Sequence, residues 1–171
     1  MWLFSRFKNA VLLAVAGVLS LVTACGGQPP ASSSSSDLVG RVVKVADGDT
    51  ITVLDASKTQ HKIRLQGIDA PEKGQAFGKV SRQYLAGMVA GREVRVTWQK
   101  RDRYQRILGT VFVDGKDANL EMLKAGLAWH YKKYDSTPAY AQVEYEARAK
   151  KVGLWGDPNQ IPPWEFRKAK K

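Results

Sequence analysis

The sequence predicts an α+β fold, mainly a β-barrel with helices: five strands in a Greek-key barrel, one inserted helix and two C-terminal helices. Short β-branched runs separated by turn residues follow residue 37, one helical period interrupts them, and further helix signals come after them. The chain has 171 residues, 44% of them hydrophobic and 25% charged, which is enough for one buried domain. This composition excludes a collagen, a coiled coil and wholesale disorder.

The five expected strands are rich in Val, Ile and Thr and end at turn residues. The Asp47-Gly48 pair predicts a tight hairpin turn between the first two strands, because Asp-Gly is a strong hairpin signal. A very polar stretch, 100–106, separates the last two strands. The expected strands are 42–45, 51–54, 63–65, 94–98 and 107–113.

One helix is expected between the third and fourth strands, ending at Gly91. Its apolar residues fall on one helical face: Phe77, Val80, Tyr84, Leu85 and Met88. Two more helices are expected, from Asp117 as N-cap to Gly126 and from Thr137 to Gly153. Five strands with a helix after the third have the element order of the oligonucleotide-binding (OB) fold.

The chain begins with features of an export signal. Residues 1–24 hold a basic start followed by an apolar run, the pattern of a secretory signal peptide. A buried helix or a permanent membrane span is the alternative, but the run is short for a span and has no basic flank behind it. Val22-Thr-Ala-Cys25 resembles a bacterial lipobox, which implies cleavage before Cys25 and acylation of its thiol.

A tether is expected between the leader and the domain. Residues 25–37 are rich in Gly, Pro and Ser and have nothing to bury, so we expect a flexible segment. The domain is expected over 38–156, followed by a basic C-terminal tail over 157–171 whose last residues, 167–171, are solvated and frayed. The expected location is the cell envelope: the outer membrane or facing the periplasm if the cell has two membranes, otherwise the cell surface.

The charge balance favours a polyanionic partner. Lys and Arg number 27 against 16 Asp and Glu, a formal net charge of +11. Nucleic acid, anionic lipid and acidic polymer all fit this charge. A single cysteine excludes an intramolecular disulfide, and only two histidines make a Cys/His zinc site a poor explanation.

Three carboxylates stand out as candidates for chemistry: Asp49, Asp69 and Glu72. Pro71 stiffens the turn that carries the last two. Carboxylates that converge without His or Cys favour a hard cation bound through oxygen, Ca²⁺ or Mg²⁺. The alternative is that they are turn and cap residues that face water.

Two arginines add to this set. Arg64 leaves its strand on the side opposite Ile63 and Leu65, and Arg106 ends the polar stretch before the fifth strand. A guanidinium matches two phosphate oxygens, and such groups beside a metal would stabilise charge on a phosphoryl centre. Taken singly, each arginine is more commonly a solvated surface residue.

Four motifs together resemble the staphylococcal (micrococcal) nuclease, or thermonuclease, family over Leu38 to Trp155. In chain order they are Val45-Ala-Asp-Gly-Asp-Thr50, Arg64-Leu-Gln-Gly-Ile-Asp-Ala-Pro-Glu72, Asp102-Arg-Tyr-Gln-Arg106, and Asn119 with Leu123 to Ala128.

The resemblance implies a role for each matching residue. Asp49, Asp69 and the backbone carbonyl of Ala70 would ligate Ca²⁺. Arg64 and Arg106 would bind the scissile phosphate, and Glu72 would activate the attacking water. Those three residues would be the catalytic ones, with the substrate bound by Arg103, Tyr104 and Tyr134.

The sequence departs from the family pattern at three positions. Ala70 stands where the family usually has threonine, and Gln105 where it has glycine. The second tyrosine of the family's base pocket falls on Lys132, with Tyr131 adjacent.

The expected function is a monomeric, calcium-dependent nuclease that cleaves DNA and RNA with little sequence preference and, by resemblance, leaves 3′-phosphates. One alternative is a non-catalytic OB-fold module that only binds nucleic acid. Another is an envelope scaffold that adheres to anionic lipid or wall polymer through its basic surface.

Overall fold

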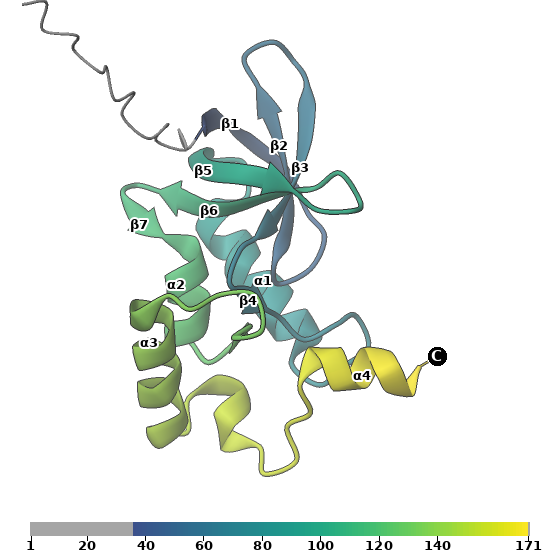
Figure 1. Cartoon of the computed structure of the whole chain (residues 1–171), viewed down its shortest axis with the longest axis vertical. Helices are drawn as coiled ribbons and strands as arrows, with labels where there is room; N and C mark the ends of the chain where they lie inside the picture. Colours follow the sequence, from purple (N-terminus) through teal and green to yellow (C-terminus); the bar gives the residue numbers. More distant parts are fainter. Residues whose placement is uncertain (1–35, 171) are drawn as a thin grey trace, which may run out of the picture. The chain divides into compact units, whose positions relative to one another are not determined.

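A computed structural model describes residues 36–170, all within one compact unit. The central feature is a barrel of strands β1 (Ser36–Val45), β2 (Thr50–Asp55), β3 (Gln60–Leu65), β5 (Glu93–Arg101) and β6 (Ile107–Val113) (Figure 1). The sheet order is β3-β2-β1-β5-β6, extended by the short β7 (Lys116–Asp117). Parallel pairing of β3 with β6 closes the barrel, with Ile63 opposite Ile107. The five-stranded OB-type barrel expected from the sequence is confirmed.

The barrel interior is filled by the alternate side chains of its strands. In β6 every second residue is buried, and in β3 Ile63 and Leu65 are fully buried while Arg64 between them is not. This is the period of two that predicted the strands. Arg64 therefore leaves the barrel wall on its outer side, as expected.

Three helices pack near the lower end of the barrel (Figure 1). They are α1 (Gly78–Val89), α2 (Ala118–Lys124) and α3 (Pro138–Ala149). The Asp117 side chain caps α2 by accepting a hydrogen bond from the amide of Leu120 at 3.0 Å, as the sequence predicted. The same carboxylate accepts a hydrogen bond from the Tyr140 hydroxyl of α3 at 3.0 Å, which ties the two helices together.

The predicted apolar face of α1 is partly wrong. Val80 and Tyr84 are 50% and 39% exposed, whereas the buried line runs through Ser81, Leu85 and Val89. Ser81 is polar, so an apolar count passes over it, but its hydroxyl donates to the carbonyl of Leu127 at 2.8 Å. A hydroxyl with a hydrogen-bond partner can be buried, so the buried face of α1 includes Ser81 and leaves Val80 and Tyr84 exposed.

Two very short strands and a C-terminal segment complete the chain. Strand β4 (Ile68–Asp69) pairs with β8 (Trp129–His130), and Asp69 lies opposite Trp129. After α3 come a 3-10 turn, η1 (Gly153–Gly156), and a last helix, α4 (Pro163–Ala169). In Figure 1, α4 (yellow) lies apart from α2 and α3.

The expectation of a frayed end over 167–171 is wrong for 167–169, which belong to α4, whereas the expected exposure to solvent holds for 168–170. Arg167 and Lys168 belong to α4, and the Arg167 guanidinium is ion-paired with Asp69 and Glu72. The prediction of a frayed tail was based on its basic residues. It overlooked two helix signals, Pro163 at the helix start and Glu165 in the first turn. Pairing with carboxylates far away in sequence gives this segment partners that its composition does not reveal.

The leader, Cys25 and nearly all of the expected tether lie outside the described residues. Strand β1 begins at Ser36, two residues before the expected domain start. Between residues 36 and 170, no helix is long and apolar enough to cross a membrane.

Asn119 joins the closed barrel to α2. It is fully buried, and its amide nitrogen donates to the carbonyls of Gln66 and Gly109 at 2.9 and 3.2 Å. Its side-chain oxygen accepts from the amide of Val111 at 3.2 Å. One side chain thus satisfies three backbone groups on two segments.

Replacement of Asn119 by alanine is expected to lower the free energy of unfolding by about 3 kcal/mol, because it leaves buried backbone groups without partners. Urea unfolding followed by circular dichroism measures the change. Asn159→Ala, at an exposed position, is the matched control and is expected to stay within about 0.5 kcal/mol of the parent. Equal stability of the two variants would show that the Asn119 network contributes nothing.

Candidate active site

A buried ion-pair cluster lies where the β1–β2 loop, β3 and β4 meet. One nitrogen of the Arg64 guanidinium, Nη2, lies 3.1 Å from Asp49 Oδ2 and 2.9 Å from Asp69 Oδ1. The other, Nη1, donates to the carbonyl of Leu65 at 2.8 Å. The Asp69 side chain is only 1% exposed. Two of the three predicted carboxylates therefore converge on one guanidinium, and the water-facing alternative does not hold for them.

Strand pairing explains this convergence. Thr50 lies opposite Arg64 in the β2–β3 ladder, so Asp49 comes next to the same end of β3. The amide of Leu65 donates to the Asp49 carbonyl at 2.8 Å, which continues the pairing by one more bond. Barrel closure thus brings together two acids 20 residues apart in sequence.

Gly48 fits this loop for a reason that the turn signal did not give. Its φ is not positive; instead, a Cβ at this position would lie 1.9 Å from the Ser81 hydroxyl and 2.7 Å from the Ala70 Cβ. Only glycine lets the loop lie this close to α1. The neighbouring Ala70 is buried, and its amide donates to Asp49 Oδ2 at 2.7 Å, so its backbone lies against the cluster.

Burial sets the electrostatics of the cluster. It raises the pKa of Asp69, although Arg167 and Arg64 both oppose this shift. Burial, together with the nearby Asp49 charge, raises the pKa of Asp47 to about 6. Asp47 is a further acid beside the predicted ones that the sequence treated only as part of a turn. Burial thus disfavours the ionised forms of Asp47 and Asp69, and the positive charge of Arg64 opposes this effect at both.

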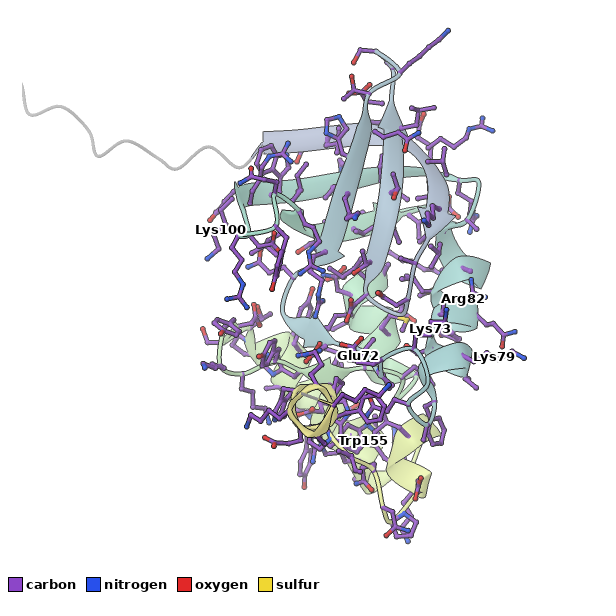
Figure 2. All side chains as sticks on the ribbon, turned by 90° about the vertical axis from the view of Figure 1, so that its right-hand side faces the viewer. Glu72, Lys73, Lys79, Arg82, Lys100 and Trp155 are labelled. Carbon is purple, nitrogen blue, oxygen red and sulfur yellow. The ribbon has the colours of Figure 1, made fainter. Side chains whose placement is uncertain are left out.

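Glu72 lies on the turn after β4, with a side chain 35% exposed. Its amide donates to the side-chain oxygen of Gln75 at 2.9 Å, and the Gln75 amide nitrogen donates to the carbonyl of Ile161 at 2.6 Å. The turn is thus fastened to the segment that leads into α4, which is seen end-on beside Glu72 in Figure 2. Glu72 Oε1 lies 2.6 Å from Arg167 Nη1.

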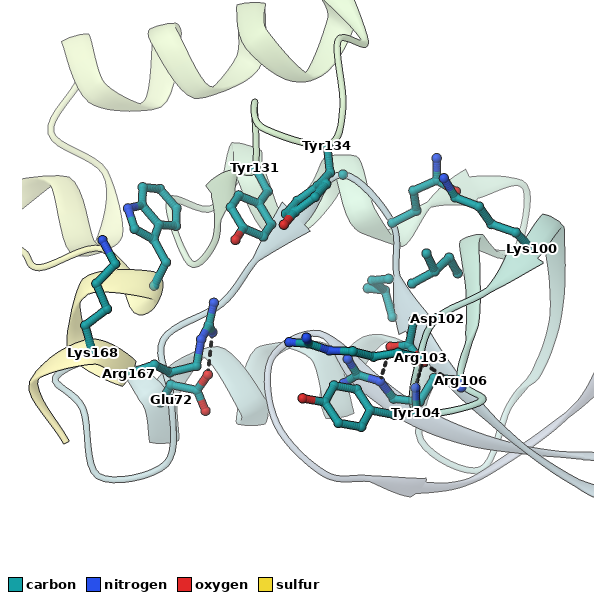
Figure 3. A pocket seen from close by; sticks show the side chains of 15 residues that line it. Glu72, Lys100, Asp102, Arg103, Tyr104, Arg106, Tyr131, Tyr134, Arg167 and Lys168 are labelled. Carbon is teal, nitrogen blue, oxygen red and sulfur yellow. Dashed lines mark hydrogen bonds and ion pairs between the residues drawn. The ribbon is translucent and has the colours of Figure 1, made fainter. Parts of the chain in front are cut away.

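The β5–β6 hairpin forms the opposite wall (Figure 3). Asp102 Oδ1 accepts from the amides of Tyr104 and Arg106 at 2.9 Å each, and Asp102 Oδ2 accepts from Arg106 Nε at 2.8 Å. Burial opposes these bonds, but together they lower the pKa of Asp102. Gln105, where the family has glycine, adopts φ +62° and keeps the loop in a left-handed turn that glycine would adopt without strain.

Aromatic residues line the end of the site near β8. The Tyr131 and Trp164 rings are stacked at 5.3 Å with an angle of 3° between them, and Tyr134 meets Tyr131 edge-on at 4.8 Å. Lys132 turns away to pair with Glu144 at 3.0 Å. Tyr131 therefore stands in the cleft at the point where Lys132 breaks the family pattern.

A cleft of about 640 Å³ joins these walls (Figure 3). It contains five of the predicted residues, Glu72, Arg103, Tyr104, Arg106 and Tyr134. It also contains Trp164 and Arg167, which the sequence did not point to, and Tyr131, which the sequence marked only as the neighbour of Lys132. Asp49, Arg64, Asp69 and Ala70 do not line it. The sequence predicted that Arg64 and Arg106 bind the same phosphate. In the structure, Arg106 faces the cleft, whereas Arg64 binds the two aspartates.

The donor set around Arg64 suits a hard cation in its chemistry. Asp49 and Asp69 offer carboxylate oxygens, and neither a histidine nor a cysteine takes part, which favours calcium or magnesium over zinc. Over residues 36–170, no group of three or more His, Cys, Asp or Glu side chains is arranged to hold a metal. A cation here would rest on these two carboxylates together with backbone oxygens and water.

Comparison with known proteins agrees with this geometry. Residues 62–157 match the family described as staphylococcal nuclease homologue. An uncharacterized endonuclease of Escherichia coli is 48% identical over 136 residues, covering 79% of this chain and 88% of the relative. A micrococcal nuclease of Shigella flexneri is 42% identical over 147 residues, 80% of this chain and 84% of the relative. The family match begins within β3 and includes Glu72, the β5–β6 hairpin and α3. The chain therefore belongs to the staphylococcal nuclease family.

Proposed function

We propose that this chain is a calcium-dependent nuclease that hydrolyses phosphodiester bonds of DNA and RNA with little sequence preference. The observation that carries the proposal is the cleft itself, in which a carboxylate, Glu72, faces arginine and tyrosine side chains across a space of about 640 Å³. A buried pair of aspartates lies next to that carboxylate. The names of the relatives, an endonuclease and a micrococcal nuclease, support the same reaction.

The residues that line the cleft have different roles in the proposed reaction. Arg106, held by Asp102 on the far wall, is positioned to bind a phosphate oxygen with the part of its guanidinium that Asp102 leaves free. Tyr104 and Tyr134 are 65% and 66% exposed and offer ring faces to bases. Glu72 takes a proton from the attacking water. Contacts to phosphates and ring faces explain a weak sequence preference.

A calcium ion on Asp49, Asp69 and the Ala70 carbonyl would supply positive charge to the phosphate under attack. By family resemblance, the bond to the 5′-oxygen breaks and a 3′-phosphate remains. We propose that the protein acts as a monomer.

Replacement of Glu72 by glutamine is expected to lower kcat by roughly 10²- to 10⁴-fold, because the amide cannot accept the proton. Turnover of heat-denatured DNA at saturating calcium measures it. Glu146→Gln removes an exposed carboxylate of α3 outside the cleft and should keep the parent rate. Unchanged turnover of the Glu72 variant would remove Glu72 from the role of base.

Removal of calcium by EDTA is expected to abolish digestion of a supercoiled plasmid and leave the far-ultraviolet circular dichroism unchanged. The fold does not depend on the ion, because the barrel core is apolar and the Arg64 guanidinium already pairs with both aspartates. Digestion that persists in EDTA would exclude a calcium requirement. A protein that binds DNA and never cuts it, with or without calcium, would be a binding module.

We further propose that the mature protein is held in the cell envelope by a lipid on Cys25, on the strength of the sequence Val22-Thr-Ala-Cys25 after an apolar run. Labelled palmitate is expected to enter the parent protein and to be absent from Cys25→Ser when each is expressed in a bacterial host. Label that persists in the variant would contradict acylation at this residue.

A further inference from the structure

Arg167 of α4 occupies the carboxylates that the proposed function requires. Its Nη2 lies 2.8 Å from Asp69 Oδ2, and its Nη1 lies 3.1 Å from Asp69 Oδ1 and 2.6 Å from Glu72 Oε1. Figure 3 shows this guanidinium next to Glu72 at the wall of the cleft. The Arg167 side chain is 41% exposed, while Asp69 beneath it is 1% exposed. Arg167 therefore stands between Asp69 and solvent.

The oxygens of Asp69 are already engaged. Oδ1 accepts from both Arg64 and Arg167, and Oδ2 accepts from Arg167. A cation that approaches from the cleft meets a bidentate guanidinium of like charge on the same carboxylate. Cation and Arg167 thus compete for Asp69, whereas Arg64 holds it from the barrel side.

Few residues of α4 are buried, which is typical of an element that can open locally. The helix has seven residues, and only Pro163 among them is buried. Besides the Arg167 ion pairs, α4 is joined to the domain by Trp164, which stacks on Tyr131 and meets Trp129 edge-on at 5.6 Å. Elements with few buried contacts open at low free-energy cost.

We propose that Arg167 is a built-in competitor of the cation: α4 seals Asp69 and Glu72 in the cation-free protein, and cation binding displaces the Arg167 guanidinium. The inference rests on the proposed calcium site. Displacement also frees Glu72, so the same event that loads the ion releases the base. The nuclease is held inactive by its own C-terminal helix until calcium arrives.

Calcium titration of the full chain by isothermal calorimetry tests the competition. Arg167→Gln is expected to bind calcium at least about fivefold more tightly than the parent, the lower end of usual coupling between two ligands. Lys170→Gln removes one positive charge from the end of the same helix, where Lys170 lies over the Phe166 ring, and is expected to keep the parent affinity. Arg167→Lys, which keeps the charge but loses the bidentate fork, is expected to fall between Gln and the parent.

Hydrogen exchange tests the reciprocal effect, because two competitors lower each other's affinity for Asp69 by the same factor. In the parent, calcium is expected to speed amide exchange in α4 and leave the barrel strands unchanged. An affinity of Arg167→Gln equal to or weaker than that of the parent, or α4 exchange unchanged or slowed by calcium, overturns the inference alone. Absence of calcium binding in both the parent and Arg167→Gln overturns the proposed calcium requirement as well. Circular dichroism confirms that each variant is folded.

Discussion

The arrangement of the site depends on the ion pairs that the Arg64 guanidinium makes with Asp49 and Asp69. The guanidinium joins the β1–β2 loop to β4 through Asp49 and Asp69, two buried carboxylates that would repel each other and pay a large desolvation cost without a positive partner. Arg64 can reach both because it lies in β3, whose pairing with β2 and β6 closes the barrel. The ion pairs of the site can therefore form only when the barrel is closed.

The cleft is built from four segments that are far apart in sequence and that the fold brings together in space. The turn after β4 supplies Glu72, the β5–β6 hairpin supplies Arg106, the loop after β8 supplies Tyr131 and Tyr134, and α4 supplies Trp164. The β4–β8 pairing brings the aromatic loop beside the acids, since Asp69 lies opposite Trp129 and the Tyr131 amide donates to the Gly67 carbonyl. Acidic, basic and aromatic surfaces thus meet at one place although no local pattern connects them.

Local periodicity predicted the barrel well because strand burial depends on alternation along the chain, as in β3 and β6. It failed where a polar or missing side chain is needed for close packing. Ser81 can lie on the buried face of α1 because its hydroxyl has a backbone partner, and Gly48 is required by the approach of that same serine rather than by a positive φ. An apolar count can detect neither reason.

The sequence by itself determined the barrel, its inserted helix and the residue types of the site, because strand alternation, helix caps and motif spacing are local properties. Only the tertiary structure decided which charges meet. It placed Arg64 on Asp49 and Asp69, turned Lys132 toward Glu144 and put Tyr131 in the cleft instead. It also brought Arg167 onto Asp69, 98 residues away in sequence. Such ion pairs arise from the closure of the fold in three dimensions, and a linear pattern holds no information about which distant partner a charged side chain meets.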